Sequence, residues 1–346
     1  MLLFLAGNLL WPVLPFILSD RTSPAIRVVR ALLGPPWFSW LLFILLYSLF
    51  ILLVGATWIP FRSGISFTRF GKWPSRIFLM GTVLFCLVGL YSALVPLRIE
   101  RPVVASASLP AALNGTRIAL LSDLHVGLFS RRSRLEKISA AVASERPDVV
   151  LLSGDMIDAD PFFVPKLLEG LSGIDAPILA VLGNHEIYGD PHRVIEQMKG
   201  SQVRLLLNEG YVLQRGASSL WIAGITDYAA TRRGRDELKP DLKRALIGRP
   251  TGAYTIALAH QPKVFADARA LGIQLSLCGH THGGQFGIRA LGFSLAGLFL
   301  PYHMGMYEED GMKLYVNTGT GFWVVPLRTG MTPEITIVTL RSDMQE

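Results

Sequence analysis

The 346-residue chain contains few cysteines and few histidines. The first shortage excludes a fold stabilised by a disulfide framework, and the second makes the positions of the histidines informative. Two cysteines, Cys86 and Cys278, cannot form a disulfide framework. Two thiols also do not indicate whether the protein lies in an oxidising or a reducing compartment. Only seven histidines are present, and five of them fall inside short motifs between residues 123 and 282. Histidines concentrated in this way indicate a functional site in this part of the chain.

Acidic side chains are almost absent from the first 101 residues. This part carries nine Lys or Arg against Asp20 and Glu100, whereas residues 102–346 carry 24 basic and 24 acidic side chains. Without net charge, the later part offers no basic stripe for a phosphate backbone, so we expect no nucleic-acid partner. The basic, apolar N-terminal part instead predicts contact with a membrane lipid bilayer.

Charge is also absent from two long runs, residues 31–61 and 77–97. Each is long enough to cross a hydrocarbon core of about 30 Å, which takes roughly 20 helical residues. We therefore expect membrane helices near residues 37–60 and 77–97.

Residues 1–19 are apolar too, but they hold Asn8, Pro12 and Pro15 and lack the pattern of a signal peptide. They predict a third spanning or re-entrant helix, with a peripheral segment as the alternative. The expected organisation is a membrane region of two to three helices over residues 1–101 and one globular domain over 102–346.

The basic residues give conflicting evidence on orientation. The loop over residues 61–76 is basic and holds no acid, which favours the cytoplasm for that loop and the outside for the domain beyond the next crossing. Basic residues in the flanking segments favour the opposite; they are Arg21, Arg27, Arg30, Arg98 and Arg101. We expect a multi-pass protein of the cell membrane whose globular domain is extracytoplasmic.

From about residue 113, short apolar runs alternate with amphipathic stretches such as the helix expected over 134–145. The strand-like runs are residues 116–121, 148–153, 177–182, 254–259 and 273–278. Two later segments, 313–316 and 334–340, alternate like antiparallel strands. The sum predicts an α/β layered fold, a β-sandwich flanked by helices and preceded by the helical membrane region.

Each of the five strand-like runs opens into a motif rich in Asp, Asn or His. The motifs are Asp123-Leu124-His125, Gly154-Asp155-Met156-Ile157-Asp158, Gly183-Asn184-His185-Glu186, Ala259-His260 and Gly279-His280-Thr281-His282. In layered α/β folds the carboxyl ends of strands meet at one edge. Asp, Asn and His are the ligands that borderline divalent metals prefer. The sequence therefore predicts a metal site at this edge.

Taken together and in this order, the motifs resemble those of the calcineurin-like metallophosphoesterases, over roughly residues 113–340. The extended block at residues 279–285 and the stretch 315–334 are most similar to the membrane-anchored bacterial branch of that superfamily. The resemblance implies two divalent metal ions, a phosphoester substrate and hydrolysis by a metal-bridging hydroxide.

The resemblance also implies which residues bind which ion. One ion would be bound by Asp123, His125, Asp155 and His282, and the other by Asp155, Asn184, His260 and His280, so that Asp155 bridges the pair. His185 would face the scissile ester and protonate the leaving alkoxide. Mixed nitrogen and oxygen ligands suit Mn, Fe or Zn without choosing among them.

Three further polar residues are candidates for supporting roles. Asp158 and Glu186 are expected to orient the histidines, although a solvated loop carboxylate is the alternative for Glu186. Arg328 is expected either to contact a phosphate oxygen or to form a surface salt bridge.

The segment over residues 286–307 follows the last ligands and is unusually apolar for a loop near a polar site. It predicts either core packing under the C-terminal strands, or an acyl-chain wall or membrane-dipping lip. The leading functional hypothesis is a membrane-anchored dimetal phosphoesterase that cleaves phosphodiester or pyrophosphate bonds of a lipid- or envelope-linked substrate. One alternative is a UDP-diacylglucosamine hydrolase of lipid A assembly, which needs a cytoplasm-facing site. A catalytically inactive metal-binding scaffold is the other.

Overall fold

The computed structural model describes residues 72–323 and 326–343, preceded by residues 47, 50, 53–59 and 64. The chain divides into two compact units, Met1–Cys86 and Leu87–Glu346. The helix predicted over residues 1–19 lies outside the described residues, as does most of the one predicted over 37–60. The fold below is that of the second unit, together with the one helix that begins in the first unit and ends in the second.

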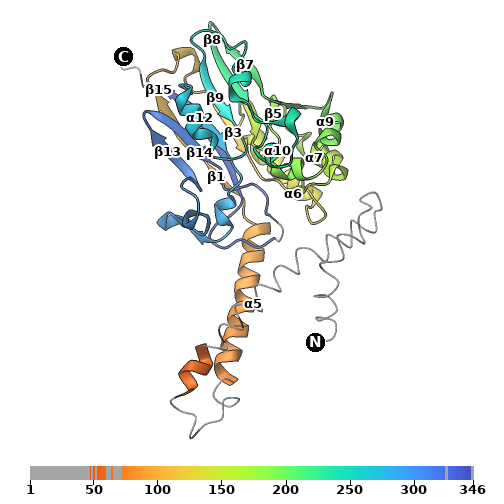
Figure 1. The fold of residues 1–346 in the computed structure, drawn as a ribbon, viewed down its shortest axis with the longest axis vertical. Coiled ribbons are helices and arrows are strands. Elements are labelled where there is room, and N and C mark those ends of the chain that lie inside the picture. The colour runs from red at the N-terminus through yellow and green to blue at the C-terminus, as the bar shows by residue number, and fades with distance from the viewer. Residues whose placement is uncertain are drawn as a thin grey trace. The chain divides into compact units, whose positions relative to one another are not determined.

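Two sheets form the centre of this unit (Figure 1). The larger has the order β1-β15-β3-β4-β5-β6, with β2 also on β15, and the smaller has the order β13-β14-β10-β9-β8-β7. The strands of the larger sheet are β1 (Arg98–Glu100), β2 (Val103–Ser106), β3 (Arg117–Leu121), β4 (Val149–Leu152), β5 (Ile178–Ala180), β6 (Val203–Leu205) and β15 (Glu334–Ser342). Those of the smaller are β7 (Glu209–Arg215), β8 (Ser218–Gly224), β9 (Tyr254–Leu258), β10 (Leu275–Cys278), β13 (Gly305–Glu309) and β14 (Met312–Val316).

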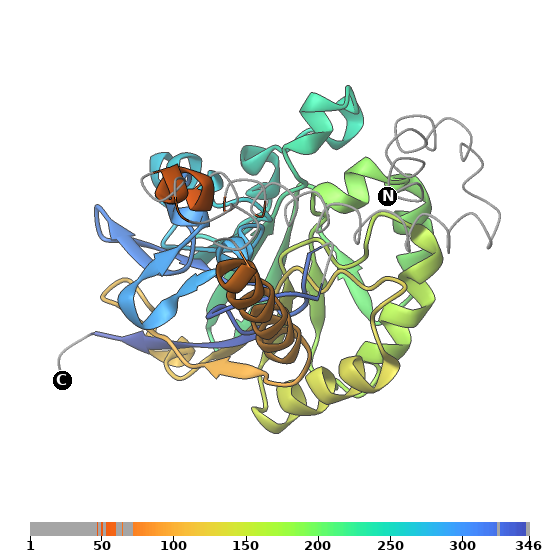
Figure 2. The ribbon, with the colours of Figure 1, turned by 90° about the horizontal axis from the view of Figure 1, so that it is seen from below.

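Alternate residues of each strand enter different cores, because successive side chains point to opposite faces of a sheet. Ile118 and Leu120 pack between the two sheets, whereas Ala119 and Leu121 pack against helices. Helices on the outer face of the larger sheet include α6 (Arg132–Ser144), α7 (Val164–Leu171) and α9 (Pro191–Met198), which Figure 2 shows in yellow and green. On the smaller sheet they are α11 (Leu242–Ala245) and α12 (Val264–Ala270). The predicted β-sandwich flanked by helices is confirmed.

The C-terminal strands are more mixed than their sequence pattern predicted. β14 is antiparallel to β13 but parallel to β10, and β15 is antiparallel to β3 but parallel to β1 and β2. Short elements complete the unit: α8 (Asn184–Tyr188), α10 (Ala229–Arg232), a β11 (Gly287–Ile288) and β12 (Phe293–Ser294) hairpin, and the 3-10 turns η2 (Ala111–Leu113), η3 (Pro161–Phe163), η4 (Asp236–Leu238), η5 (His282–Gly284), η6 (Arg289–Leu291) and η7 (Ala296–Leu298).

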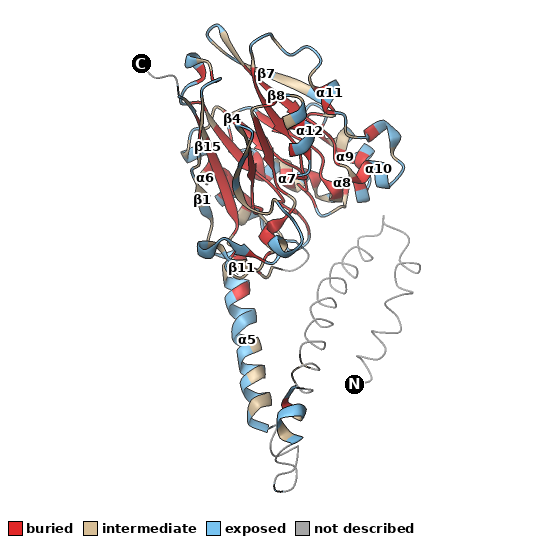
Figure 3. Ribbon diagram, turned by 60° about the vertical axis from the view of Figure 1, so that its left-hand side comes forward, coloured by how far each residue is buried: buried red, intermediate tan, exposed pale blue. Residues whose placement is uncertain are grey.

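Helix α5 (Lys72–Leu94) overlaps the membrane helix predicted near residues 77–97. In the described part of the chain it is the one helix long and apolar enough to cross a membrane, by length and composition. Its side chains are mostly exposed, as Figure 3 shows, and its buried residues, Gly89 and Ala93, lie near its carboxyl end.

Candidate metal centre

The seven predicted ligands are brought together from five strands. β3 ends before Asp123 and His125, β4 before Asp155, and β5 before Asn184, the first residue of α8. In the other sheet β9 ends before His260, and β10 before His280 and His282. The site therefore straddles the carboxyl ends of both sheets, where parallel strands present their following loops.

The backbone at this edge adopts a conformation that L-residues seldom take. Asp123, His125, Asp155, His280 and His282 have φ values of 52°, 43°, 48°, 73° and 52°. Left-handed non-glycine residues cost about 1–3 kcal/mol each and persist where the surrounding structure holds them. Half of the ten such residues in the described part of the chain are predicted ligands, which indicates that the strain serves the site.

Two glycines allow the ligand loops to approach one another. A Cβ on Gly183 would overlap Asp155 Oδ1, and one on Gly279 would overlap Ser122 Oγ and lie 2.6 Å from Asp123 Oδ2. Both contacts are closer than real Cβ atoms permit, so a side chain at either position would displace a ligand carboxylate.

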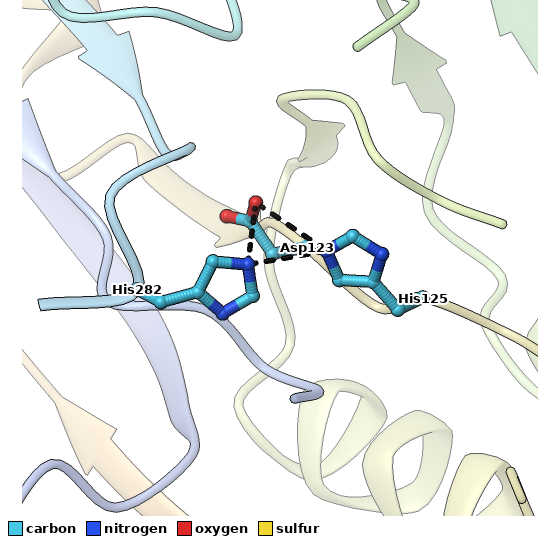
Figure 4. Close-up of side chains that lie close together, drawn as sticks. All are labelled: Asp123, His125 and His282. Atoms are coloured by element: carbon cyan, nitrogen blue, oxygen red, sulfur yellow. Dashed lines mark hydrogen bonds and ion pairs between the residues drawn. The ribbon is translucent and has the colours of Figure 1, made fainter. Parts of the chain in front are cut away.

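The first cluster consists of Asp123, His125 and His282, whose side chains converge in Figure 4. The two Nε2 atoms are 3.1 Å apart, and His282 Nε2 lies 3.3 Å from Asp123 Oδ1. Asp123 is fully buried, and its Oδ1 atom has no hydrogen-bond partner. A buried, unpartnered carboxylate oxygen beside two facing imidazole nitrogens fits a divalent cation.

The second cluster is built around His260. Its Nδ1 atom lies 2.8 Å from the carbonyl oxygen of Ser153, which can only accept, so Nδ1 carries a proton and Nε2 is the atom that faces the site. That Nε2 lies 3.3 Å from Asp155 Oδ2, 3.0 Å from Asn184 Oδ1 and 3.0 Å from His280 Nδ1. Four ligand atoms thus converge on a second point that fits a cation.

Asp155 belongs to both neighbourhoods. Its Oδ2 atom lies 3.7 Å from His125 Nε2 in the first cluster and 3.3 Å from His260 Nε2 in the second. A carboxylate in this position could bridge two cations and reduce their mutual repulsion.

The ionisation states of most candidate ligands suit metal binding. His260 is the exception and would release a proton on binding, because Asp155 outweighs the effect of burial and raises its pKa. Burial lowers the pKa of His125 to about 3, and burial together with His260 lowers that of His280 to about 3. Both rings are therefore neutral at pH 7, the form that binds metals. Burial alone would raise the pKa of Asp155, but the neighbouring His260 and His125 outweigh it, and its pKa lies below its ordinary value. The Asp155 carboxylate is therefore ionised.

His185 lies at the edge of the clusters. Its Nδ1 atom is 3.2 Å from Asp158 Oδ1, and its side chain is partly exposed. Burial opposes a charge on this ring, yet Asp158 and Asp155 outweigh it and raise the pKa of His185. A histidine that keeps its proton near neutral pH suits a general acid. His185 also lies within ligand distance of His125 and Asp155, so the geometry permits a metal-ligand role as well.

The environment of Glu186 excludes the alternative of a solvated loop carboxylate. The side chain is fully buried, and burial together with Asp155 raises its pKa to about 7. Its oxygens accept backbone N–H groups of Gly183, Asp155 and Ile157 at 2.7, 3.1 and 3.0 Å. Glu186 therefore fastens the Asp155 loop to the Asn184 loop through the backbone.

Arg328 is neither a surface salt bridge nor free to contact a substrate. It is fully buried, its guanidinium donates to the carbonyl oxygens of Thr318 and Met331, and its Nη2 atom lies 3.0 Å from His282 Nδ1. Burial lowers its pKa to about 10, so it remains charged at pH 7. Arg328 holds the ring of His282 with Nε2 facing Asp123.

We expect Arg328→Lys to weaken metal binding about 10–100-fold, the usual effect of losing a residue that orients a ligand. Lysine keeps the charge but loses the planar fork that spans two carbonyls and a ring nitrogen. Isothermal titration with Mn²⁺ measures the change, with the exposed Arg341→Lys as the matched control. Affinity equal to that of the control would show that Arg328 does not position His282.

One buried pair was not predicted. Asp227 and Gln261 are buried and hydrogen-bonded to each other at 2.9 Å, and Gln261 directly follows His260. Asp227 follows β8, the same position relative to a strand that the ligand motifs occupy. An Asp shortly after a strand could have indicated this residue in the sequence. The strand itself was not predicted, because β8 begins with polar residues.

Buried Asp, Asn and His side chains at the carboxyl ends of a layered sandwich define a metal-binding class of protein. Residues 116–284 match the sequence profile of the calcineurin-like phosphoesterases. An uncharacterised metallophosphoesterase of Aquifex aeolicus is 30% identical over 262 residues, which cover 74% of this chain and 97% of that protein. The chain belongs to this family, whose members use two divalent metals, and the two clusters fit that pair.

Other relatives are longer. A zebrafish (Danio rerio) protein named as a transmembrane protein with a metallophosphoesterase domain is 32% identical over 75% of this chain and 61% of its own length. A Campylobacter jejuni metallophosphoesterase is 32% identical over 67% of this chain and 61% of its own length. The chain thus spans about six tenths of these relatives. The solved structure of a Thermus thermophilus sulfate thiohydrolase aligns over 67% of this chain and 57% of its own, with 14% identity and a TM-score of 0.42.

Proposed function

We propose that the chain is a dimetal phosphodiesterase or pyrophosphatase anchored in a membrane. The observation that carries the proposal is the position of Asp155 Oδ2, within 3.7 Å of His125 Nε2 and 3.3 Å of His260 Nε2. When bound, two cations at this position would supply Lewis acidity toward a phosphate and lower the pKa of a coordinated water. Mn, Fe and Zn all suit these ligands.

The protein's own residues supply proton transfer and positioning. His185 keeps a proton because Asp158 and Asp155 raise its pKa, and it would donate that proton to the leaving alkoxide. Asp158 Oδ1, 3.2 Å from His185 Nδ1, orients the ring toward this task. Glu186 and Arg328 hold ligand loops and a ligand ring in place without needing contact with the substrate.

We also propose that the substrate is lipid-linked or envelope-linked and that the enzyme is a multi-pass membrane protein with an extracytoplasmic site. Contacts of Arg328 support a site close to lipid. Its backbone N–H donates to the carbonyl of Gly89 in α5 at 3.0 Å, and the side chain of Arg328 contacts the predicted ligand His282. The basic loop over residues 61–76 supports the orientation.

Because α5 and the uncharged run over residues 31–61 supply the anchor, the full-length protein should stay in the membrane fraction after washing with high salt or alkaline carbonate. Immunoblotting of pellet and supernatant measures this. Release into the supernatant would contradict a spanning anchor. Reporters that are active only in the periplasm or only in the cytoplasm, fused after Glu346, then show on which side of the membrane the globular domain lies. A cytoplasmic result would favour the UDP-diacylglucosamine hydrolase alternative.

The activity itself is tested by a metal-by-substrate screen of the purified full-length protein. Metal-stripped protein should regain turnover of a chromogenic phosphodiester when Mn²⁺, Fe²⁺ or Zn²⁺ is added. Metal binding without turnover of any diester, pyrophosphate or lipid substrate would favour the inactive scaffold.

A further inference from the structure

The loop over residues 288–300, here named the apolar lip, carries large apolar side chains that the fold does not bury. Leu291, Leu298 and Phe299 are 76%, 61% and 80% exposed. Four others in the same loop are also exposed: Ile288, Phe293, Leu295 and Leu300. Monomeric soluble proteins seldom expose so many neighbouring apolar side chains without a partner. Core packing under the C-terminal strands, one expectation for this segment, is excluded for these seven.

The lip is held firmly at its base. On one side Gly287 N–H donates to the carbonyl of Thr329, and Thr329 N–H donates to that of Gln285, both at 2.9 Å. On the other side Thr281, which lies between ligands His280 and His282, donates its hydroxyl to the carbonyl of His303 at 2.7 Å. The base of the apolar lip is thus hydrogen-bonded to the loop that carries the predicted ligands His280 and His282.

The same base touches α5. A Cβ on Gly89 would lie 2.5 Å from Leu327 Cδ1, the carbonyl of Gly89 accepts the N–H of Arg328, and Ala93 is 2% exposed. Segment 327–329 therefore packs on one side against the carboxyl end of α5 and pairs on the other with the base of the lip. Figure 3 shows β11, at the base of the lip, beside this end of α5.

The length of α5 then sets the depth of the lip. Its uncharged helical part runs from residue 77 to 94 and spans about 27 Å at 1.5 Å per residue. A hydrocarbon core of about 30 Å needs all of it. Gly89 precedes the helix end by about 7.5 Å. If α5 crosses the bilayer, Gly89 and the segment against it lie below the bilayer surface.

Charge near this end of α5 agrees with that depth. A small cavity of about 160 Å³ is bordered by Ala93 and Leu94 of α5 and by the basic Arg131, Arg134 and Lys137. No acidic residue is among the described residues lining it. Arg134 donates to the carbonyl oxygen of Pro96 at 3.0 Å, just beyond the helix end. Cations at this level would meet anionic lipid headgroups.

We infer that the apolar lip is a second membrane contact, which inserts beside α5 into the same bilayer and holds the metal centre at the lipid surface. The inference rests on the proposed membrane crossing of α5 and deepens the proposed function, because a site held at this depth meets lipid-linked phosphoesters directly. The occupant is lipid, and a second copy of the chain is the competing occupant.

Depth is measured on the full-length protein, independently of hydrolysis. In a Cys86→Ala background, where Cys278 is buried, Phe299→Cys is labelled with bimane and reconstituted into phosphatidylcholine vesicles containing acyl-chain nitroxide lipids. Ile247→Cys is the matched control, since Ile247 is 75% exposed and follows α11, at the other end of the unit in Figure 3. We expect nitroxide lipids to quench the label at 299 at least several-fold more than the label at 247.

Equal quenching at both positions would overturn the inference. Shielding of the label at 299 from aqueous iodide, without quenching by nitroxide lipids, would identify a second copy as the cover and would also overturn it. A double variant, Leu298→Asn with Phe299→Asn, adds a functional arm. It should lower turnover of a vesicle-embedded phosphodiester several-fold and leave turnover of a small soluble diester unchanged. Equal loss of turnover on both substrates would contradict a membrane-binding role for the lip. If neither protein hydrolyses any diester, the proposed function fails, while the quenching result still decides the lip.

Discussion

Asp155→Ala should abolish turnover and lower the metal bound at both clusters. Its Oδ2 atom approaches His125 Nε2 in one cluster and His260 Nε2 in the other, so both cations would lose a shared anion. Two cations without a bridging carboxylate also repel one another more strongly inside a buried site. Elemental analysis of the purified variant measures bound metal per chain, and a chromogenic diester measures turnover.

The matched control is Asp158→Ala. Asp158 is a neighbouring carboxylate, 49% exposed in its side chain, and belongs to none of the ligand clusters among the described residues. This control should keep its metal while losing turnover through His185. An Asp155→Ala variant with normal metal content would show that Asp155 is not a shared ligand, and the dimetal assignment would fail.

His185→Ala should separate catalysis from metal binding. We expect turnover to fall by about 10²–10⁴-fold, the usual effect of losing a general acid, while metal content stays near that of the wild type. The raised pKa of His185 and its contact with Asp158 favour this outcome. Paired measurements of kcat and metal content on the same preparation give the result.

A substrate with a very good leaving group supplies the control. Such an ester needs little protonation, so it should partly restore turnover in the His185→Ala variant. Because His185 also lies within ligand distance of His125 and Asp155, metal could instead fall in step with turnover. That result would make His185 a ligand and would break the proposed division of roles.

The sequence predicted the strands that precede the candidate ligands because these strands are buried on both faces. β3, β4, β5, β9 and β10 are buried almost throughout and therefore form continuous apolar runs. β7 escaped prediction for the opposite reason. It is an edge strand whose residues alternate between exposed and half-buried, so no apolar run marks it.

The candidate ligands could be found in the sequence, but the residues that hold them in place could not. Motif order and residue type indicate metal chemistry at Asp123 or His260 without any structure. Glu186, however, acts on backbone groups about 30 positions earlier, and Arg328 acts on a ring 46 positions earlier. A carboxylate or guanidinium that serves distant groups carries no local signal, so its burial appears only in the folded protein.

The most direct test of the central claim is anomalous diffraction from crystals of the protein grown with Mn²⁺. The account predicts two peaks on either side of the Asp155 carboxylate, one beside Asp123, His125 and His282 and the other beside Asn184, His260 and His280. A single peak, or peaks that leave Asp155 without a metal contact, would contradict it.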